Sequence, residues 1–391
     1  MNKPLTTVSN ITTGKLDSNA AKENGAYPFF TCAPEPLSID KFSFDDDVIL
    51  LAGNNAQGDF HINRYCGKFD AYQRTYVITA KEGYDIDYVY YSLELALRHL
   101  KRIAQGSQTK FLTMQILDGF MIEDIPFDSQ TNLIASIKAI DAKIALNKRI
   151  NAELEAMAKT IYDYWFVQFD FPDKSGKPYR TSGGAMEWNE QLNREIPKGW
   201  KVGRFCDAAN IVMGQSPSGD SYNEQGTGMV FFQGSTDFGT DYPSTRVYTT
   251  APSRIAQQGD ILLSVRAPVG TMNTAFEKCC IGRGLAAINS KIGANTYLKC
   301  LVAGLKTHFD IFNGNGTTFG SLTKDTLYEI VTIMPPDDLV LSFEKALPAN
   351  SEIRLNNEKQ TRELTRLRDW LLPMLMNGQA TVSAEDNIAD D

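Results

Sequence analysis

The chain has 391 residues, of which 42% are hydrophobic and 22% are charged. This length fits two or three domains, and the composition is typical of folded proteins. The formal net charge of −8 argues against a protein that coats nucleic acid without sequence preference. Four of the negative charges lie in the C-terminal tail, at Glu385, Asp386, Asp390 and Asp391, so a local basic surface elsewhere is compatible with the total.

The composition also bears on location and on metals. No apolar run approaches the roughly 18 to 20 residues of a membrane span, and the first residues lack the apolar stretch of a signal peptide. We therefore expect a cytoplasmic protein that does not contact a membrane. The six cysteines show no C-x-x-C spacing, and the three histidines are far apart, which predicts buried or half-buried free thiols and no metal site.

The first part of the chain predicts a module of mixed strands and helices. Short apolar segments bounded by Gly, Pro and Asn predict strands, at NITTG (10–14), PFF (28–30), FDDDVILLAG (44–53) and YCGKFDAYQRTYVI (65–78). An amphipathic helix from Tyr88, a polar loop ending in Phe, a short helix and a strand follow before Pro126. The order of these elements indicates an α+β module.

A long helix follows the first module. Its apolar and amide residues alternate steps of four and three, which predicts a single coiled-coil seam of Leu133, Ile137, Ile140, Ile144, Asn147, Asn151, Leu154, Ala158, Ile161 and Trp165. A single seam needs a partner helix to bury it. After the helix, the alternating segment up to Pro172 predicts a short strand.

The second half of the chain repeats the first. NIVMG (210–214), VFF (230–232), QQGDILLSVR (257–266) and CCIGRGLAAI (279–288) match the four strand segments in the same order, and a helix, loop, short helix and strand follow. One difference is the lead before NITTG, which is shorter than the GWKVGRFCDAA before NIVMG. It predicts that the first module lacks an initial strand or turn.

The second unit also ends in a helix. Its expected seam consists of Ile353, Asn357, Gln360, Leu364, Leu367, Leu371 and Met374, and Pro348 should break or kink the upstream end. Amides in both seams can fix register, unless the seam has been assigned one residue away from its true position. The predicted fold class is therefore α+β, with two duplicated α/β domains joined by two long antiparallel coiled-coil-like helices; the resemblance described below implies that they are target recognition domains. The predicted boundaries are 1–128, 129–166 (central helix), 167–200 (linker), 201–338, 339–378 (C-terminal helix) and 379–391 (acidic tail).

The loops lack the motifs of the common enzyme classes and are rich in residues that suit DNA. There is no phosphate-binding loop, no nucleophile elbow and no zinc-protease helix, so no catalytic residue is assigned. Arg, Asn and Gln read base edges, and Lys, Ser and Thr suit phosphates. The DNA-binding candidates are Lys15, Lys22, Asn54, Asn55, Gln57, Arg64, Tyr72, Gln73, Arg74, Gln108 and Lys110 in the first module, and Gln215, Ser216, Ser218, Gln233, Arg246, Arg254, Arg266, Arg283, Thr317 and Thr318 in the second.

The chain resembles the DNA-specificity subunit of type I restriction-modification systems over nearly its full length. The resemblance is carried by NITTGKLDSNAA, NGAYPFFTC, AKTIYDYWFVQFDFP, GGAMEWNEQLNREIPKGW and LRDWLLPMLMNGQ, and by GQSPSGDSYN, FFQGSTDFG, LLSVRAPVG and KCCIGRGLAAI. It implies a noncatalytic subunit used in phage defence, in which each domain reads one half of a split, asymmetric site in double-stranded DNA. The helices then act as a spacer.

The resemblance also implies partner subunits. Two modification subunits would bind S-adenosylmethionine and methylate a flipped adenine, and restriction subunits that use ATP and Mg would join them. The chain itself would bind no cofactor. The docking surface is expected at the two helix ends, at Tyr162, Trp165, Phe166, Trp370, Leu371 and Met374; alternatively, these residues only close a local core.

Two other functions compete with this interpretation. A single-chain DNA methyltransferase would need a cofactor-binding domain, for which neither half has length to spare. A nonenzymatic protein-binding scaffold would show no sequence-dependent affinity for DNA.

Overall fold

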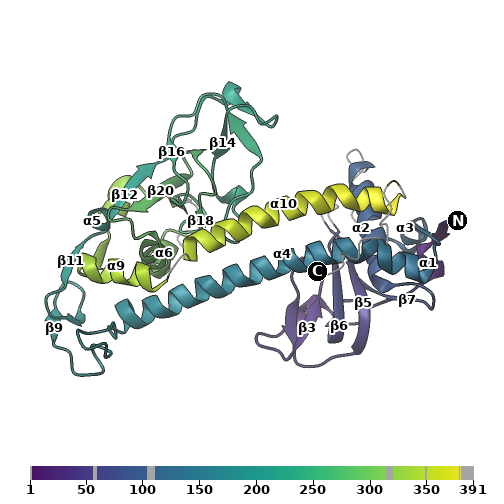
Figure 1. The fold of residues 1–391 in the computed structure, drawn as a ribbon, viewed down its shortest axis with the longest axis horizontal. Helices are drawn as coiled ribbons and strands as arrows, with labels where there is room; N and C mark the ends of the chain where they lie inside the picture. Colours follow the sequence, from purple (N-terminus) through teal and green to yellow (C-terminus); the bar gives the residue numbers. More distant parts are fainter. Residues whose placement is uncertain are drawn as a thin grey trace, which may run out of the picture. The chain divides into compact units, whose positions relative to one another are not determined.

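The computed structural model describes residues 2–55, 60–103, 111–313, 320–347, 350–377 and 379. The chain divides into two compact units, which are described separately. Unit 1 comprises Met1–Ala145 and Arg362–Asp391, and unit 2 comprises Leu146–Thr361. In Figure 1 the sheet of unit 1 is purple to blue, and the sheets of unit 2 are teal to green.

In the described part of unit 1, a six-stranded sheet and the β1–β8 pair are accompanied by the helices α1, α2 and α3. The elements are β1 (Asn2–Pro4), α1 (Leu5–Val8), β2 (Ser9–Thr13), β3 (Tyr27–Phe30), β4 (Leu37–Ile39), β5 (Phe44–Ala52), β6 (Ile62–Ala71), β7 (Thr75–Ala80), α2 (Ile86–Ile103), α3 (Met114–Asp118) and β8 (Met121–Glu123). The sheet order is β2-β7-β5-β6-β3-β4. Among the pairings described for this sheet, β3–β6 is the parallel one, and the others are antiparallel.

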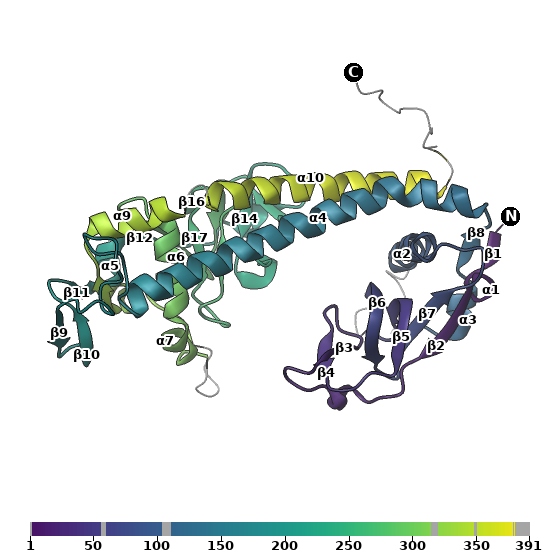
Figure 2. The same cartoon turned by 60° about the horizontal axis from the view of Figure 1, so that its bottom comes forward.

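Strand β5 is buried on both faces of this sheet. Because side chains alternate along a strand, Ile49 and Leu51 pack into one cluster, with Tyr88 of α2, while Val48 and Leu50 pack into another, with Phe69. Helix α2 covers the first of these faces (Figure 2). The uninterrupted apolar run in the sequence reflects this two-sided burial.

Unit 2 repeats this plan, except that the strands matching β5 and β6 are shorter. Its elements are β9 (Met186–Asn189), β10 (Arg194–Pro197), β11 (Lys201–Arg204), α5 (Phe205–Ala208), β12 (Ala209–Met213), β13 (Tyr222–Asn223), β14 (Met229–Phe232), β15 (Val247–Thr249), β16 (Ile255–Ala256), β17 (Ile261–Ser264), β18 (Met272–Thr274), β19 (Cys279–Ile281), β20 (Leu285–Ser290), α6 (Asn295–Gly304), α7 (Lys306–Asp310), α8 (Lys324–Tyr328), β21 (Val331–Met334) and α9 (Asp337–Ala346). Two sheets have the orders β12-β20-β17-β18 and β13-β15-β14-β19-β16.

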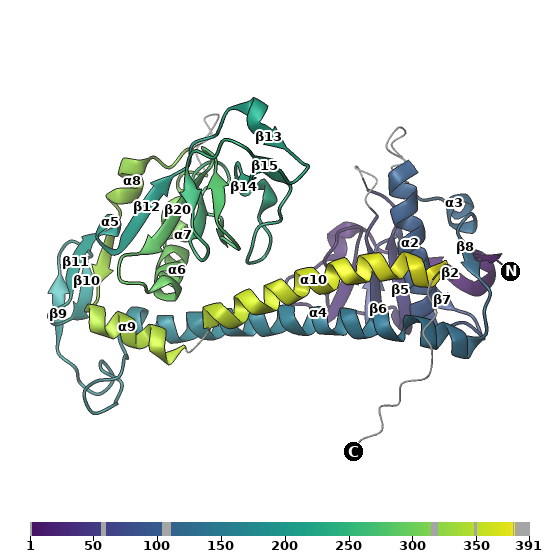
Figure 3. The same cartoon turned by 45° about the horizontal axis from the view of Figure 1, so that its top comes forward.

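The duplication predicted from the sequence is confirmed by these elements. The parallel pairing of β14 with β19 matches that of β3 with β6. Helix α6 takes the place of α2. It packs between the sheet and the C-terminal end of the long helix α4 (Phe127–Tyr162) (Figure 3). Thr113 caps α3 and Thr323 caps α8, each through its side-chain oxygen, so even the short helices begin in the same way.

The prediction that the first module lacks an initial strand is wrong. Strand β1 pairs antiparallel with β8, with Lys3 opposite Ile122, as β11 pairs with β21, with Val202 opposite Ile333. The short helices α1 and α5 follow in the two units. The strand was missed because it is only three residues long and ends in Pro4, which is tolerated at the edge of a sheet but weakens any strand pattern.

The first long helix, α4 (Phe127–Tyr162), buries the expected seam. Ile137, Ile144, Asn147, Asn151 and Ala158 are all buried, and the remaining seam residues are half-buried. The strand expected up to Pro172 is absent from these described residues. Instead, a π-helical turn, Asp163–Val167, extends α4, and Phe169 and Phe171 then pack into the core of unit 2.

The predicted C-terminal helix 339–378 is two helices in the structure. The first, α9, ends at Ala346, and the second, α10, runs over Asn350–Met376, so the break falls where it was expected. Pro348 itself lies outside the described residues. In the region predicted as a linker, β9 and β10 form a hairpin, and Ile196 and Trp200 join the core of unit 2.

The seam of α10 keeps Asn357 and Leu364 at their predicted positions, but its other predicted residues are replaced by their next neighbours along the chain. Ile353 and Leu367 are exposed, whereas their neighbours Arg354 and Arg368 face inward. The inward residues along this stripe include Asn350, Arg354, Asn357, Thr361, Leu364, Arg368, Leu372 and Leu375. Arg354 and Arg368 occupy this stripe because they pair with carboxylates there, and apolar periodicity alone does not predict such positions.

Hydrogen bonds in each unit connect α4 with α10. In unit 2, Asn147 Nδ2 donates to Gln360 Oε1 at 3.3 Å, Asn357 Nδ2 donates to Asn151 Oδ1 at 2.9 Å, and Asn350 Nδ2 donates to the carbonyl oxygen of Leu154 at 3.0 Å. Partner numbers along α10 therefore fall as those along α4 rise. The amides predicted to lie in the two seams do hydrogen-bond one another, although Gln360 itself is exposed.

Candidate nucleic-acid interface

In unit 1, the ends of three strands meet at one edge of the sheet. The turn between β6 and β7 is held by Tyr72 N, which donates to the carbonyl oxygen of Phe30 at 2.8 Å. Gly14, after β2, donates to Thr75 at 3.1 Å, and Gly53, after β5, donates to Arg74 at 2.8 Å. These backbone bonds bring together the loops that follow β2, β3 and β5 with the β6–β7 turn. We call this set of loops the loop edge of unit 1.

Unit 2 forms the same edge with an equivalent set of backbone bonds. Gly282 N, in the turn between β19 and β20, donates to Phe232 O at 2.8 Å. Gly214 donates to Leu285 at 2.9 Å, and Val265 donates to Gly284 at 2.9 Å. The loop edge of unit 2 is thus built from the same elements as that of unit 1. The backbone is repeated while the side chains differ.

One glycine at each edge is required by close packing. A Cβ atom on Gly14 would lie 1.9 Å from the carbonyl oxygen of Ala71, and a Cβ on Gly214 would lie 2.1 Å from that of Gly282. Neither distance is compatible with any side chain. The loops after β2 and β12 can therefore approach the neighbouring turns this closely only where the residue is glycine. Both glycines close the segments in which the repeat was first recognised.

The loop edge of unit 1 gathers several predicted DNA-binding residues. Lys15, Gln73 and Arg74 are exposed there, and Asn54 and Tyr72 are half-buried. Leu16 forms a bridge with Tyr72, and Asn54 forms a bridge with Phe111. Cationic and amide side chains therefore share one surface with an aromatic ring.

Phe111 also lies at this edge, although it is not among the predicted DNA-binding residues. Its side chain is 54% exposed, and the Arg74 guanidinium lies 5.8 Å from its ring centroid. The polar loop of the repeat was recognised as ending in Phe, but its position beside Arg74 depends on the tertiary fold. The equivalent residue of unit 2 is Ser321, which forms a bridge with Arg266.

The loop edge of unit 2 carries a different set of predicted residues. Gln215, Gln233, Arg266 and Arg283 are exposed there. The hydroxyl of Ser216 accepts a hydrogen bond from the backbone N–H of Arg283 at 3.3 Å, which joins the two loops. Arginine and amide side chains are the groups that read guanine and adenine edges in the major groove.

Three predicted cations are instead held by carboxylates. Lys22 pairs with Asp40 at 2.6 Å, and Arg246 pairs with Asp237 at 3.0 Å. Arg64 lies between Asp47 at 2.7 Å and Asp87 at 2.6 Å, and it also donates to the carbonyl oxygen of Val48. Arg64 therefore connects strand β6 to helix α2, a structural role that its sequence context did not reveal.

The remaining candidates lie further along these loops, beside β16, or outside the described residues. Asn55 is half-buried, Ser218 hydrogen-bonds Asp220, and Arg254 is exposed beside β16. Gln57, Gln108, Lys110, Thr317 and Thr318 lie outside the described residues.

The expected docking residues of the first helix end are mostly in the core of unit 2. Phe166 is only 5% exposed, and its ring centroid lies 4.8 Å from that of Tyr297 and 5.4 Å from that of Phe343. Tyr162 is also buried, and burial raises its pKa well above the usual value. Trp165 is half-buried against Phe343. Tyr162 and Phe166 therefore close a local core, which was the alternative to a docking role.

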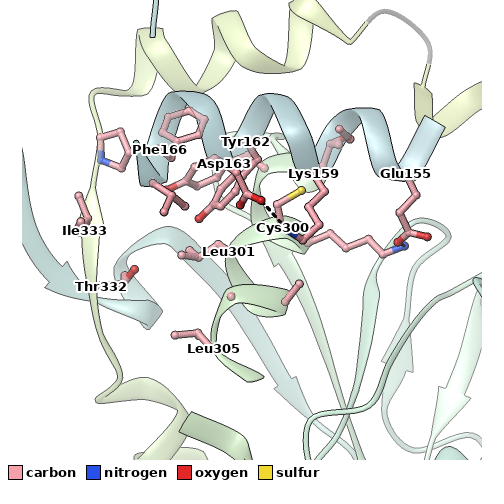
Figure 4. Close-up of a pocket in the computed structure, with 18 of the residues that line it drawn as sticks. Glu155, Lys159, Tyr162, Asp163, Phe166, Cys300, Leu301, Leu305, Thr332 and Ile333 are labelled. Carbon is pink, nitrogen blue, oxygen red and sulfur yellow. Dashed lines mark hydrogen bonds and ion pairs between the residues drawn. The ribbon is translucent and has the colours of Figure 1, made fainter. Parts of the chain in front are cut away.

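A cavity of about 520 Å³ lies beside this helix end (Figure 4). Tyr162, Cys300 and Leu301 line its apolar part, and burial raises the pKa of Cys300 to about 12. At the other helix end, in unit 1, Trp370 is 59% exposed, while Leu371 and Met374 are half-buried. The exposed docking candidate is therefore Trp370.

Among the described residues, no three His, Cys, Asp or Glu side chains gather so that they could hold a metal ion. None of the helices in the described ranges combines the length and apolar character of a membrane span.

Residues 1–156 and 197–338 match a protein family described as the type I restriction modification DNA specificity domain. The fold is similar to that of the type I restriction-modification system S subunit from M. genitalium, with a TM-score of 0.58 and 15% identity over 96% of this chain and 95% of that one.

Two curated relatives are similar in sequence. A protein of Methanocaldococcus jannaschii named "Putative type I restriction enzyme MjaX specificity subunit" is 34% identical over 66% of this chain and 58% of its own length. The type I restriction enzyme EcoDI specificity subunit of Escherichia coli is 35% identical over 52% of this chain and 47% of its own length. The matches thus span about half the length of these relatives. Because the family match covers most of both repeats, the chain belongs to the family of type I restriction modification DNA specificity domains.

Proposed function

We propose that this chain is the DNA sequence-specificity subunit of a type I restriction-modification complex. Each recognition module reads one half of a bipartite, asymmetric site in double-stranded DNA. The chain itself is noncatalytic, and the methyltransferase and endonuclease activities belong to partner subunits. The two curated relatives are both named as specificity subunits of type I restriction enzymes, which supports this assignment.

The observation that carries the proposal is the repeated loop edge with different side chains. Equivalent backbone bonds support Lys15, Gln73 and Arg74 in unit 1 and Gln215 and Arg283 in unit 2. Two recognition modules that share a backbone but differ in their side chains suit a DNA site whose two halves differ in sequence. A fixed protein scaffold with variable polar loops is a common way to change specificity without changing fold.

The electrostatics of the edges also suit DNA. Base readout depends on a few arginines and amides that form paired hydrogen bonds, so it does not require a positive net charge. The carboxylates that hold Lys22, Arg64 and Arg246 leave these three less suited to phosphates than Lys15, Arg74, Arg266 and Arg283. We therefore assign readout to the loop edges first.

The helices α4 and α10 supply the spacer in this proposal, as an antiparallel coiled-coil-like pair. The amide bonds between Asn147 and Gln360 and between Asn357 and Asn151 support an antiparallel register. Because each base pair rotates the duplex by roughly 35°, two readers joined by a stiff spacer accept their half-sites only at one separation.

The partners follow from the same proposal. Two modification subunits, which bind S-adenosylmethionine and methylate adenine, dock on the helices, with Trp370 at the exposed helix end of unit 1. Restriction subunits that use ATP and Mg join this complex.

Methylation mapping tests the proposal directly. The chain is co-expressed with the modification subunit encoded beside it in a host that lacks adenine methylation, and methylated adenines are mapped by single-molecule sequencing. We expect one split motif, methylated on both strands and lost when this chain is omitted. A purified, stable complex that methylates no split motif would contradict the proposal.

Two controls separate the competing functions. Methylation by this chain without a partner, together with binding of S-adenosylmethionine, would indicate a single-chain methyltransferase. Binding to a protein partner with no sequence-dependent affinity for DNA would indicate a scaffold. In the proposed function, DNA affinity depends on sequence and falls steeply with salt.

A further inference from the structure

In unit 1, a cluster of charged and phenolic side chains joins one module helix to both long helices. The Asp141 carboxylate of α4 accepts a hydrogen bond from Tyr91 of α2 at 2.7 Å and from Arg368 of α10 at 3.0 Å. Next to it, Arg98 of α2 pairs with Asp369 of α10 at 3.0 Å. We call Tyr91, Asp141 and Arg368 the unit 1 clamp.

Unit 2 contains a corresponding cluster. The Glu155 carboxylate of α4 lies 3.3 Å from Arg354 of α10 and 3.0 Å from Lys299 of α6. Arg354 and Lys299 also both pair with Asp241, which lies in the segment between β14 and β15. We call Lys299, Glu155, Arg354 and Asp241 the unit 2 clamp.

The two clamps occupy matching positions on the long helices. Glu155 follows Asp141 by two heptads along α4, and Arg354 precedes Arg368 by two heptads along α10. One antiparallel register therefore satisfies both acid–arginine pairs. In each clamp the third partner comes from the equivalent module helix, α2 or α6, so each clamp joins one module to the same pair of helices.

The charged groups of each clamp favour one arrangement of their partners. Burial acts to lower the pKa of Arg368, but its hydrogen bonds to Asp141 and Asp369 raise the pKa above the usual value. Burial acts to raise the pKa of Glu155, but Lys299 and Arg354 lower it overall. A guanidinium between two carboxylates fits only one arrangement, whereas apolar contacts tolerate small rotations.

Buried ion pairs of this kind add little net stability, because desolvation offsets the attraction between the charges. Their best-attested use is to specify one arrangement among several. We infer that Arg354 and Arg368 are positioning residues that hold each recognition module in one orientation on the helix pair, and thereby restrict the half-site separation that the subunit accepts. The inference rests on the proposed function.

The test uses the full complex with its modification subunits and the half-sites found by methylation mapping. Duplexes carry both half-sites at the natural separation, or with one base pair added or removed. The readout is the initial methylation rate at the natural separation divided by the rate at each altered one. The thermal midpoint of the complex is measured in parallel.

Four variants and one control define the expected result. Arg354→Met and Arg368→Met should each lower the rate ratio about tenfold, with the half-site sequences unchanged. Arg354→Lys and Arg368→Lys should give intermediate ratios, since an ammonium keeps the charge but lacks the fork that spans two carboxylates. Arg366→Met, at an exposed arginine of the same helix, should keep the original ratio.

The inference is overturned if the methionine variants assemble, melt at lower temperature and keep the original ratio, because the clamps would then act on stability alone. If the methionine variants do not assemble, the lysine variants decide, and an unchanged ratio in them overturns the inference. Failure of the proposed function looks different, since the unmodified complex would then methylate no split site at all.

Discussion

The amide of Asn147 on α4 meets the amide of Gln360 on α10, with Nδ2 donating to Oε1 at 3.3 Å. Asn147 is fully buried, with 0% of its surface exposed, and its Nδ2 also lies 3.4 Å from the carbonyl oxygen of Asn357. Its Oδ1 atom accepts no hydrogen bond from the described residues. The seam therefore contains a polar group that is only half satisfied.

Replacing this amide should stabilise the protein. In Asn147→Leu, the unsatisfied oxygen is removed and an apolar side chain fills the seam, so we expect the free energy of unfolding to rise by about 1–2 kcal/mol. Chemical unfolding of the complex measures the change. The matched control is Asn151→Leu: Asn151 donates to Arg354 O and accepts from Asn357, so its loss should lower stability. Equal effects at both positions would contradict this account.

The loop edges predict which arginines affect readout. Arg283→Ala removes an exposed side chain at the edge of unit 2 and should relax specificity at one base of one half-site, at a cost of about 1–3 kcal/mol. Methylation mapping with variant half-sites measures this change.

Arg64→Ala is the comparison for that experiment. It breaks the contacts with Asp47 and Asp87 and leaves their charges uncompensated, so it should lower the melting temperature. The preferred sequence should not change. Altered base preference in Arg64→Ala with normal stability would show that Arg64 reads DNA after all.

The two helix ends predict opposite effects of removing an aromatic ring. Phe166→Ala empties a buried position in the core of unit 2 and should cost about 3–5 kcal/mol of stability. Trp370→Ala removes an exposed ring, so stability should change by less than about 0.5 kcal/mol. Association with the modification subunit should weaken for Trp370→Ala, measured by titration calorimetry. Normal association in that variant would remove Trp370 from the docking surface.

The ion pairs of Asp87 predict a dependence of stability on pH. Burial acts to raise the pKa of Asp87, but hydrogen bonds from Lys138 and Arg64 lower it below the usual value of 3.8. A lowered pKa in the folded state means that the stabilisation is present above pH 3.8 and is lost as the pH falls through the folded pKa.

Asp87→Asn should therefore lower stability near neutral pH and flatten the acid limb of the stability curve below about pH 4. Unfolding by denaturant between pH 2 and pH 7 tests this. Asp46→Asn, at an exposed carboxylate of β5, serves as the control and should leave the curve unchanged. An acid limb that keeps its slope in Asp87→Asn would refute the assignment.

The repeat, the module class and the seam of the first long helix could be predicted from sequence. Strands such as β5 and helices such as α2 are encoded in local periodicity, and two copies of the same order reinforce each other. The glycines Gly14 and Gly214 mark equivalent turns because no other residue fits there. The amides Asn147 and Asn151 appeared in the predicted seam because they take positions that apolar residues otherwise fill.

The positions of the second seam and of the initial strand were decided by the tertiary structure. The tertiary structure also decided which basic side chains pair with carboxylates. Arg354 and Arg368 face inward because they pair with carboxylates of α4. Arg64 likewise pairs with Asp47 and Asp87. Local sequence assigns a charged residue to the surface, since burying a lone charge is costly. Whether a partner removes that cost is decided by residues far away in the chain, so only the fold could separate the arginines that pair with carboxylates from those that stay exposed at the loop edges.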